Sequence, residues 1–291
     1  GQKLLSCRGI SPKIYRKKTI MKNLVSTEWL QENVDNVRIL DASWHMPSSK
    51  RNGKEEFFKG HIKNSSFFDL DKYSNQNSPL PHMLPDANYW EKTISEFGIK
   101  NSDHIIVYDN SDVMSSCRIW YNFLYFNHNP NLVSVLNGGL KKWLKENREI
   151  TKSIKKFTKS NYQAIENLNM VLDKNQIDLN IKNRNYELID ARGKNRFRGL
   201  EPEPRKELKT GHIEGSKNIP FTELINVSDN TLKNKQDLIK IFNSLGLDSS
   251  KDLAFTCGSG VTACILGLAN SIITGKNPVI YDGSWSEYGL K

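Results

Sequence analysis

An internal repeat is the feature that most constrains how this 291-residue chain can fold. Short apolar runs that end in Asp-Ala occur at residues 37–42 and 186–191. Each run is followed by a Gly-His-Ile tripeptide, at residues 60–62 and 211–213, so that the offset between the copies stays near 150 residues. Landmarks repeated in the same order at one offset indicate a duplicated structural unit. We therefore expect two domains of similar fold.

Within each copy, strand-like and helix-like segments alternate. Residues 105–109 and 253–257 are short apolar runs of strand length, whereas residues 88–97 and 237–242 carry apolar side chains at the period of a helix. Such alternation is typical of a parallel sheet covered by helices. The sequence therefore predicts an α/β fold made of two tandem domains, each a parallel sheet flanked by helices.

The repeat also sets the predicted domain limits. Residues 21–150 form the first predicted domain and residues 186–291 the second. Residues 151–185 between them are polar and rich in Lys and Asn, which indicates a linker. Residues 1–20 precede the first domain as a basic leader.

The charge of the chain is concentrated in that leader. Residues 1–20 hold six of the Lys and Arg residues and no acid, so the formal charge of +10 falls to 36 basic against 32 acidic residues in the remainder. Since no basic stripe is interleaved with aromatic residues, we expect no nucleic-acid partner. No apolar run approaches the roughly 20 residues that cross a bilayer, so we expect no membrane partner.

The leader also bears on location. A basic, acid-free segment that contains serine is typical of a mitochondrial transit peptide. An irregular tail would have a similar composition. We therefore predict a mitochondrial protein, with a cytoplasmic location as the alternative.

Four cysteines occur in the chain, and they favour a reducing compartment. Cys7, Cys117, Cys257 and Cys264 are too few for a disulfide scaffold, and no CxxC pair indicates a metal site. We expect no metal and no organic cofactor. Cys117 and Cys264 read as small buried side chains of helices, and a resolving thiol is the minor alternative for Cys264.

The segment that begins at Cys257 is suited to nucleophilic chemistry. A free thiol with a pKa near ~8.5 is mostly protonated at neutral pH, so a reactive cysteine needs stabilisation of its thiolate. Gly258 and Gly260 can adopt backbone angles that direct N–H groups at the sulfur, and a predicted helix over residues 263–270 adds the positive end of its dipole. Asp109 occupies the corresponding place in the first copy. Only the second copy can therefore carry this nucleophile, although a core cysteine beside a glycine turn stays the alternative.

The loop at residues 257–264 resembles the active loop of the 3-mercaptopyruvate sulfurtransferases, within the tandem-domain rhodanese family. Further segments share the likeness: residues 40–44, 82–85, 137–140, 196–205 and 281–285. The resemblance implies an inactive first domain, a catalytic second domain and sulfur transfer through a persulfide on Cys257. It also implies that the rest of the loop holds the substrate, namely Gly258, Gly260, Val261 and Thr262.

The resemblance assigns the substrate cations to Arg196 and Arg205. Guanidinium groups bind carboxylate and keto oxygens in a two-pronged manner. In thiosulfate sulfurtransferases the two residues after the cysteine are typically basic, whereas here they are Gly258 and Ser259. Small neutral neighbours favour 3-mercaptopyruvate as the donor. Surface ion pairs of the two arginines with the glutamates of residues 201–203 are the alternative.

A proton relay is the third implied element. The resemblance pairs the loop serine, Ser259, with His61 of the first domain. The residues after His61 lack the usual proline and glycine, and residues 50–54 offer no aspartate, so we expect no acid-assisted triad. His61 as a structural histidine is the alternative, and its repeat partner His212 is expected to be structural.

The predicted activity is sulfur transfer from 3-mercaptopyruvate through Cys257 to a thiol or cyanide, with release of pyruvate. Thioredoxin and small thiols are the expected acceptors, and thiosulfate:cyanide sulfurtransfer is the alternative reaction. A cysteine phosphatase of the same fold would need an arginine at position 263, which is alanine. A sulfur-relay or scaffold protein with negligible turnover is the non-enzymatic alternative, because the family usually extends further beyond the position of Lys291.

Overall fold

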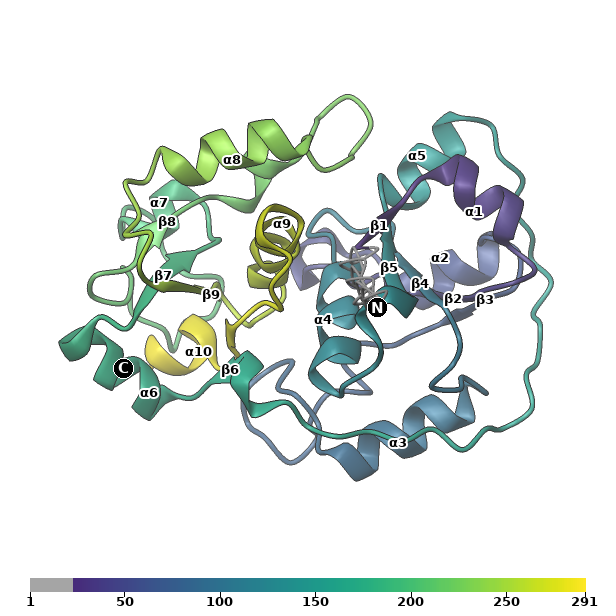
Figure 1. Ribbon diagram of the computed structural model, residues 1–291, viewed down its shortest axis with the longest axis horizontal. Coiled ribbons are helices and arrows are strands. Elements are labelled where there is room, and N and C mark those ends of the chain that lie inside the picture. Colours follow the sequence, from purple (N-terminus) through teal and green to yellow (C-terminus); the bar gives the residue numbers. More distant parts are fainter. Residues whose placement is uncertain (1–22) are drawn as a thin grey trace, which may run out of the picture.

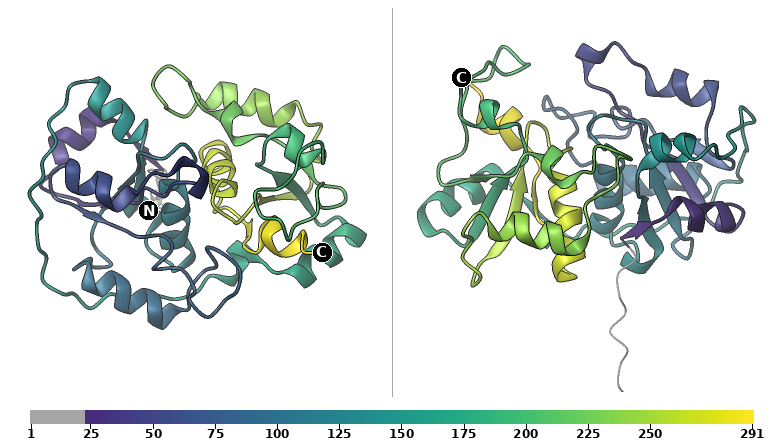
Figure 2. Two further views of the ribbon diagram at one scale, coloured as in Figure 1. Left: turned by 180° about the vertical axis from the view of Figure 1, so that it is seen from behind. Right: turned by 90° about the horizontal axis from the view of Figure 1, so that it is seen from above.

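Two five-stranded parallel sheets form the framework of the computed structural model, which describes residues 23–291 (Figure 1). The predicted leader, including Cys7, lies outside the described residues. Figure 2 shows the two domains side by side, with helices packed on both sheets. The predicted α/β fold with two tandem domains is therefore confirmed.

The first domain has the sheet order β1-β5-β4-β2-β3. Its strands are β1 (Leu24–Val25), β2 (Arg38–Asp41), β3 (Ser65–Phe67), β4 (Ile105–Tyr108) and β5 (Val133–Leu136). Its helices are α1 (Thr27–Asn33), α2 (Gly53–Lys59), α3 (Ala87–Glu96), α4 (Ser116–Tyr125) and α5 (Gly139–Lys145).

The second domain has the sheet order β6-β10-β9-β7-β8. Its strands are β6 (Val171–Leu172), β7 (Tyr186–Asp190), β8 (Lys217–Asn218), β9 (Asp252–Thr256) and β10 (Ile280–Tyr281). Its helices are α6 (Lys174–Asn183), α7 (Lys194–Phe197), α8 (Lys235–Asn243), α9 (Ala263–Thr274) and α10 (Ser284–Tyr288).

The two sheets repeat one topology, since each strand of the first domain has a counterpart five strands later at the same place in the sheet. Strand β4, which precedes Asp109, and strand β9, which precedes Cys257, are both the central strand. The duplication predicted from the sequence is thus present in the structure. It places Asp109 and Cys257 at equivalent carboxyl ends of central strands.

The second domain begins earlier than the sequence predicted. Strand β6 pairs with β10 in the second sheet, and α6 follows it, although both lie within the predicted linker at residues 151–185. The two-residue strand is too short to show a period, and α6 buries only Ile177 and Asn180. Residues 152–167 therefore form the connection, and they run along the first domain, where the N–H of Ser160 binds the carbonyl of Ser95.

Helices α4 and α9 pack against each other and join the domains (Figure 1). All of α4 is buried, as is α9 from Ala263 to Ser271. A helix that is apolar around its whole circumference is buried on all sides. One hydrophobic cluster therefore runs through both domains, and it includes Trp120 of the first and Ile265 of the second.

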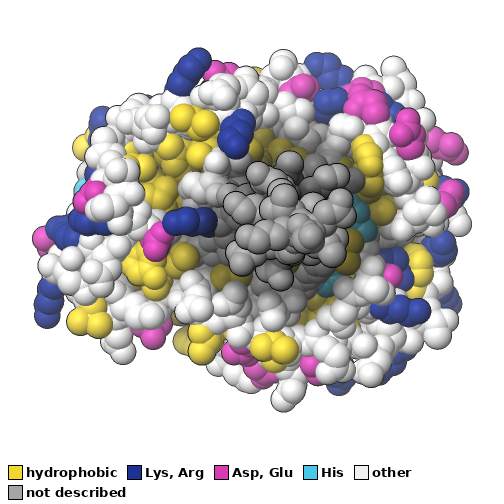
Figure 3. Space-filling model, in the orientation of Figure 1, with side chains coloured by type: hydrophobic (Ala, Val, Ile, Leu, Met, Phe, Trp, Pro, Cys, Tyr) yellow, Lys and Arg dark blue, Asp and Glu magenta, His cyan; other side chains and the backbone are white. Residues whose placement is uncertain are grey.

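The surface carries mixed charge on the face shown in Figure 3, where Lys and Arg side chains are interspersed with Asp and Glu. Among the described residues, no helix is long and apolar enough to cross a membrane.

Strand β2 ends in a buried carboxyl group, Asp41, that lacks a cationic partner among the described residues. One of its oxygens, Oδ1, accepts hydrogen bonds from the N–H (2.9 Å) and the hydroxyl (2.6 Å) of Ser43. Burial outweighs these bonds and raises the pKa of Asp41 to about 7. Its counterpart in the second domain, Asp190, is instead paired with Arg192 at 2.7 Å.

We predict that Asp41 makes the folded protein less stable as the pH rises. An aspartate in the unfolded chain loses its proton near pH ~3.9, whereas folded Asp41 keeps its proton to a pH of about 7. Its contribution to stability is therefore full below about pH 4 and is lost as the pH rises to about 7. Asp41→Asn keeps the acceptor oxygen and removes the titration. Urea unfolding at about pH 5 and about pH 8 should show a smaller drop in the free energy of unfolding for D41N than for the wild type. Equal drops would contradict this assignment.

Candidate active site

Cys257 lies directly after β9, at the carboxyl end of the central strand of the second sheet, and is 1% exposed. In parallel α/β sheets, ligands bind in the crevice outside the carboxyl ends of the strands. Helix α9 begins six residues later, at Ala263. The strand, turn and helix therefore follow the order predicted from the sequence.

The backbone of the cysteine loop is fixed from below by α10. The N–H groups of Trp285 and Ser286 donate to the carbonyls of Cys257 (2.9 Å) and Gly258 (2.8 Å). The hydroxyl of Ser284 accepts from the N–H of Cys257 at 3.1 Å. A loop whose carbonyls and N–H groups are bound in this way keeps its shape when a charge develops on the sulfur.

One of the predicted N–H donors reaches the sulfur. The N–H of Gly260 donates to Sγ of Cys257 at 3.1 Å. Gly260 has φ +80°, a conformation that residues with a Cβ rarely adopt, which explains the glycine. This bond stabilises a negative sulfur more than a neutral one. It is the geometry that a cysteine nucleophile needs.

The loop serine is joined to a histidine of the first domain, but that histidine is His82. The hydroxyl of Ser259 lies 2.9 Å from Nδ1 of His82, and Nε2 of His82 lies 2.9 Å from Oδ1 of Asp71. A carboxylate only accepts hydrogen bonds, so Nε2 carries the hydrogen, Nδ1 of the neutral ring is an acceptor, and Ser259 donates to it. The hydrogen bond from His82 lowers the pKa of Asp71. Ser259, His82 and Asp71 therefore form a relay across the two domains.

Trp44 holds this relay in place. Its indole N–H donates to Oδ2 of Asp71 at 3.1 Å, which leaves Oδ1 to His82. Its ring also meets the ring of His82 edge-on, with 4.7 Å between the centroids. Trp44 thereby orients a carboxylate that is 66% exposed. His82 itself has φ +60°, and such backbone strain concentrates at functional sites.

The prediction of His61 as the relay partner of Ser259 is wrong. His61 is 1% exposed, and its ring nitrogens lie 2.8 Å from the carbonyl of Phe57 and 3.1 Å from that of Ser153. Its two polar atoms are thus occupied by backbone of the first domain. The expectation that no carboxylate assists the relay is also wrong, because Asp71 does so from outside the segment considered, residues 50–54.

Both histidines of the repeated Gly-His-Ile tripeptides are structural. His61 stacks on Phe57 and His212 on Phe197, in each case with 3.9 Å between the ring centroids. Nδ1 of His212 also lies 2.7 Å from the carbonyl of Phe197, as Nδ1 of His61 does from that of Phe57. The contact is the same in the copy that has Cys257 and in the copy that has Asp109 in its place, which indicates a role in the fold.

Three arginines reach the pocket above Cys257, and they differ in how far carboxylates neutralise them. Arg192 is buried between Asp190 (2.7 Å) and Glu203 (2.8 Å). Arg196 binds the other oxygen of Glu203 at 2.6 Å and keeps 25% of its side chain exposed. Arg205 makes no ion pair within residues 23–291. The surface-pair alternative thus holds in part for Arg196 alone, and positive charge remains available beside Cys257.

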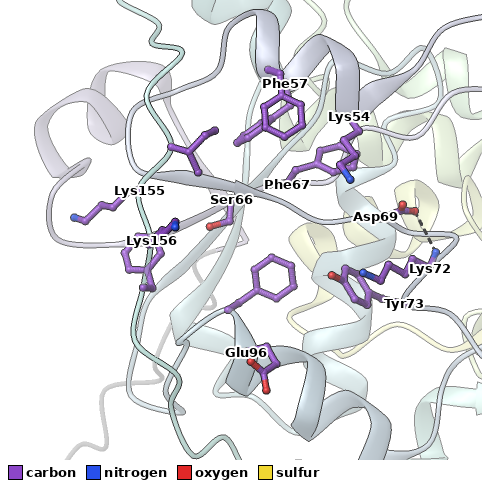
Figure 4. Close-up of a pocket in the computed structure, with 14 residues that line it drawn as sticks. Lys54, Phe57, Ser66, Phe67, Asp69, Lys72, Tyr73, Glu96, Lys155 and Lys156 are labelled. Carbon is purple, nitrogen blue, oxygen red and sulfur yellow. Dashed lines mark hydrogen bonds between the residues drawn. The ribbon is translucent and has the colours of Figure 1, made fainter.

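The pocket has a volume of about 430 Å³ and is lined by both domains. The lining includes all the predicted loop and arginine residues except Gly260, which lies behind the sulfur: Arg196, Arg205, Cys257, Gly258, Ser259, Val261 and Thr262. Trp44 and Val113 close it from the first domain. A second pocket of about 440 Å³, shown in Figure 4, is lined by Phe57, Phe67 and several lysines and shares no lining residue with the first.

The other cysteines of residues 23–291 are buried packing residues. Cys117 and Cys264 are 0% exposed, and burial raises the pKa of both thiols. Sγ of Cys264 donates to the carbonyl of Gly260 at 3.3 Å. The predicted burial of both is confirmed. A resolving thiol must form a thiolate, and the raised pKa of Cys264 disfavours one.

Comparison with known proteins agrees with this geometry. A family model described as "Rhodanese-like domain" matches residues 26–146 and again residues 173–291. The chain belongs to the rhodanese-like domain family. The two matches coincide with the two copies of the repeat, and the second begins beside β6.

Full-length relatives of this rhodanese-like protein are sulfurtransferases by name. The 3-mercaptopyruvate sulfurtransferase of Homo sapiens is 35% identical over 281 residues, which cover 94% of this chain and 93% of that protein. The mitochondrial thiosulfate/3-mercaptopyruvate sulfurtransferase 1 of Arabidopsis thaliana is 37% identical over 292 residues, which cover 92% and 76%. The crystal structure of SseA from Escherichia coli, described as a 3-mercaptopyruvate sulfotransferase, superposes with a TM-score of 0.80 at 33% identity, over 91% of this chain and 99% of that one. The resemblance stated from the sequence is confirmed.

We predict that two neighbouring arginines of this rhodanese-like site differ sharply in their effect on stability. Arg192→Met leaves Asp190 buried without a cation, which costs about 3–5 kcal/mol of unfolding free energy. Arg196→Met leaves Glu203 paired with Arg192 and should cost less than about 1 kcal/mol. Urea unfolding of both variants measures the difference. A loss for R196M as large as that for R192M would show that Arg196 is a structural residue.

Proposed function

We propose that this rhodanese-like protein is a sulfurtransferase that moves sulfur from 3-mercaptopyruvate, through a persulfide on Cys257, to a thiol or cyanide, with release of pyruvate. The observation that carries the proposal is a cysteine sulfur at a pocket, with the N–H of Gly260 at 3.1 Å and unneutralised arginine charge on the same lining. Its relatives bear the names of sulfurtransferases.

The lining of the pocket fits a donor with charge at one end only. In 3-mercaptopyruvate the carboxylate and the keto oxygen lie away from the transferable sulfur, and Arg205 and Arg196 bind such oxygens in a two-pronged manner. Beside Cys257 the loop offers Gly258 and Ser259, which carry no charge. A thiosulfate ion would bring its sulfonate charge to these neutral residues.

In the first step the thiolate of Cys257 attacks the sulfur of the donor. A bond forms between the two sulfurs, the carbon–sulfur bond of the donor breaks, and its electron pair stays on carbon as the enolate of pyruvate. Arg196 and Arg205 stabilise the charge that spreads over the keto oxygen. The enolate then takes a proton, and Cys257 is left as a persulfide.

The relay of Ser259, His82 and Asp71 supplies that proton. When His82 is protonated on Nδ1, it passes a proton through Ser259 to the enolate, and the ring takes up another proton from solvent before the next turnover. Asp71 holds the imidazole so that Nδ1 faces Ser259, and it stabilises the ring when the ring is charged. The serine is next but one to Cys257, so the relay ends beside the reacting sulfur. An arrangement of hydroxyl, histidine and carboxylate also moves protons on unrelated folds, where the histidine acts first as a base and then as an acid.

In the second step an external nucleophile removes the outer sulfur. A thiolate attacks that sulfur, the sulfur–sulfur bond breaks, and Cys257 leaves as its thiolate. A protein dithiol of the thioredoxin kind, a small thiol or cyanide can act in this way. The outer sulfur leaves with the acceptor. Cys264 is buried and therefore cannot take that sulfur from Cys257.

Location stays a prediction for this protein. The basic leader that indicates a transit peptide lies outside the described residues, and the Arabidopsis relative bears a mitochondrial name. We therefore keep the mitochondrion as the proposed compartment and the cytoplasm as the alternative.

We predict that Cys257→Ser abolishes the release of pyruvate from 3-mercaptopyruvate, because no other described thiol lies on the pocket. Mass spectrometry of the wild type after incubation with the donor and without acceptor should show one added sulfur atom on Cys257. The C257S variant should show none.

The control is Cys264→Ser, which keeps the pocket and should keep the activity. Pyruvate release by C257S would contradict the proposal, and a wild type without added sulfur would indicate a scaffold. A higher kcat/KM for thiosulfate than for 3-mercaptopyruvate would show that the alternative donor is the correct one.

We predict opposite effects for the two histidines of the first domain that the sequence and the structure single out. His82→Gln breaks the relay and should lower kcat by about a hundredfold. His61→Gln should leave kcat within about twofold and lower the melting temperature, because its ring contacts Phe57 and backbone only. Steady-state kinetics and thermal unfolding of both variants test this. A hundredfold loss in H61Q with normal H82Q would restore the assignment made from the sequence.

A further inference from the structure

A buried arginine of the first domain lies against the back of the cysteine loop. Arg118 is the third residue of α4 and is 0% exposed. Its Nη1 donates to the carbonyl of Gly260 at 2.9 Å, and its Nη2 donates to the carbonyl of His82 at 2.7 Å. The same Nη2 lies 2.7 Å from Oδ1 of Asp282. The reaction described above does not use this residue.

Gly260 is held between this guanidinium and the peptide that carries Asp282. Its N–H donates to Sγ of Cys257 at 3.1 Å, while its carbonyl, on the next peptide, accepts from Arg118. A Cβ on Gly260 would lie 2.8 Å from Nη1 of Arg118 and 3.0 Å from the carbonyl oxygen of Asp282. Because the carbonyl of Gly260 is bound and its φ is +80°, these contacts restrict how the N–H of Gly260 can point at Sγ of Cys257.

The same ion pair holds the relay histidine. Arg118 binds the carbonyl of His82, and the N–H of Leu84 donates to Oδ2 of Asp282 at 2.8 Å. The chain that follows His82, whose φ is +60°, is therefore fixed at two points, the carbonyl of His82 and the N–H of Leu84. A strained backbone persists only where its surroundings hold it in place, and here Arg118 and Asp282 do so.

Burial of two charges is a poor way to gain stability, which indicates another reason for this pair. Removing an ion pair from water costs about as much as the pair regains, whereas its geometry specifies one arrangement of its neighbours. Burial alone would lower the pKa of Arg118, but Asp282 outweighs it and raises the pKa. The guanidinium therefore stays charged at neutral pH beside Asp282.

We propose that Arg118 is a positioning residue for the sulfur-transfer reaction, through which the first domain aims the N–H of Gly260 at Cys257 and sets His82 beside Ser259. The proposal rests on the proposed role of Cys257 as nucleophile. The first domain, which has Asp109 in place of a cysteine, thus contributes the arginine that positions the cysteine loop of the second domain.

The test compares Arg118→Met and Arg118→Lys with a matched control, Tyr121→Phe. Tyr121 lies one turn further along α4, is equally buried, and donates to the carbonyl of Met170 outside the cysteine loop. Two readouts are needed. The first is kcat and KM with 3-mercaptopyruvate, and the second is the rate of alkylation of Cys257 by iodoacetamide without any sulfur donor.

We expect R118M to lower kcat by about ten- to a hundredfold and to change KM by less than about threefold, because Arg196 and Arg205 are untouched. Alkylation of Cys257 should slow in the same variant. R118K should recover part of both, since one ammonium can replace some bonds of the planar fork. Y121F should lower the melting temperature and leave kcat and alkylation within about twofold.

Where R118M does not fold, the double variant R118M/D282N is measured instead, because it leaves no unpaired buried carboxylate. Values of kcat and alkylation within twofold of wild type in the folded variant would overturn the proposal. Equal losses in Y121F would do the same, because they would trace the effect to the domain interface in general. The alkylation assay tests Arg118 independently of the proposed function. A wild type without activity on 3-mercaptopyruvate would contradict the proposed donor. Slower alkylation of Cys257 in R118M would still support the positioning role of Arg118.

Discussion

The hydrogen bond from the N–H of Gly260 to Sγ of Cys257, 3.1 Å long, is the interaction on which the rest of the site depends. A sulfur in a buried loop becomes a usable nucleophile only if its negative form is stabilised without water. Strand β9 supplies the position, a left-handed glycine supplies the direction of the N–H, and α10 binds the loop carbonyls. Each of these features is local in sequence except α10, which the fold brings underneath.

The first domain shows what the same loop does without a sulfur. Asp109 follows the equivalent strand, and its two carboxylate oxygens accept from the N–H groups of Ser111 (2.9 Å) and Ser116 (3.0 Å). N–H groups at the end of a central strand therefore face an acceptor in both copies. In the first copy a carboxylate fills the place, and the first domain meets the site of the second through α4 and the segment around His82.

The sequence allowed the fold to be predicted, and also the gathering of Cys257, Arg196 and Arg205 at one place, because each lies in a contiguous motif: the repeat, the loop at residues 257–262 and the segment at residues 196–205. The relay could not be predicted so well. His82 and Asp71 lie in irregular chain with no period, and their meeting with Ser259 depends on how the domains pack. The signal in the sequence is the segment at residues 82–85, which shares the family likeness and contains His82. His61 was predicted because the resemblance pairs it with Ser259, yet His61 and its repeat partner make a stacking contact that is common to both domains.

The three arginines at the pocket form a gradient of available charge. Arg192 is neutralised by Asp190 and Glu203, and Arg196 shares Glu203 with it. Arg205 makes no ion pair within the described chain, although its charge helps to lower the pKa of Asp71. A substrate carboxylate gains most where the cation is least neutralised and still partly desolvated, because there it replaces water and not a protein carboxylate. We therefore propose that the carboxylate of the donor binds at Arg205 and its keto oxygen nearer Arg196, whose guanidinium nitrogen lies 3.2 Å from where a Cβ of Gly258 would be. The lack of a side chain at Gly258 thus keeps Arg196 close to the reacting sulfur, and a larger residue there would push the guanidinium away.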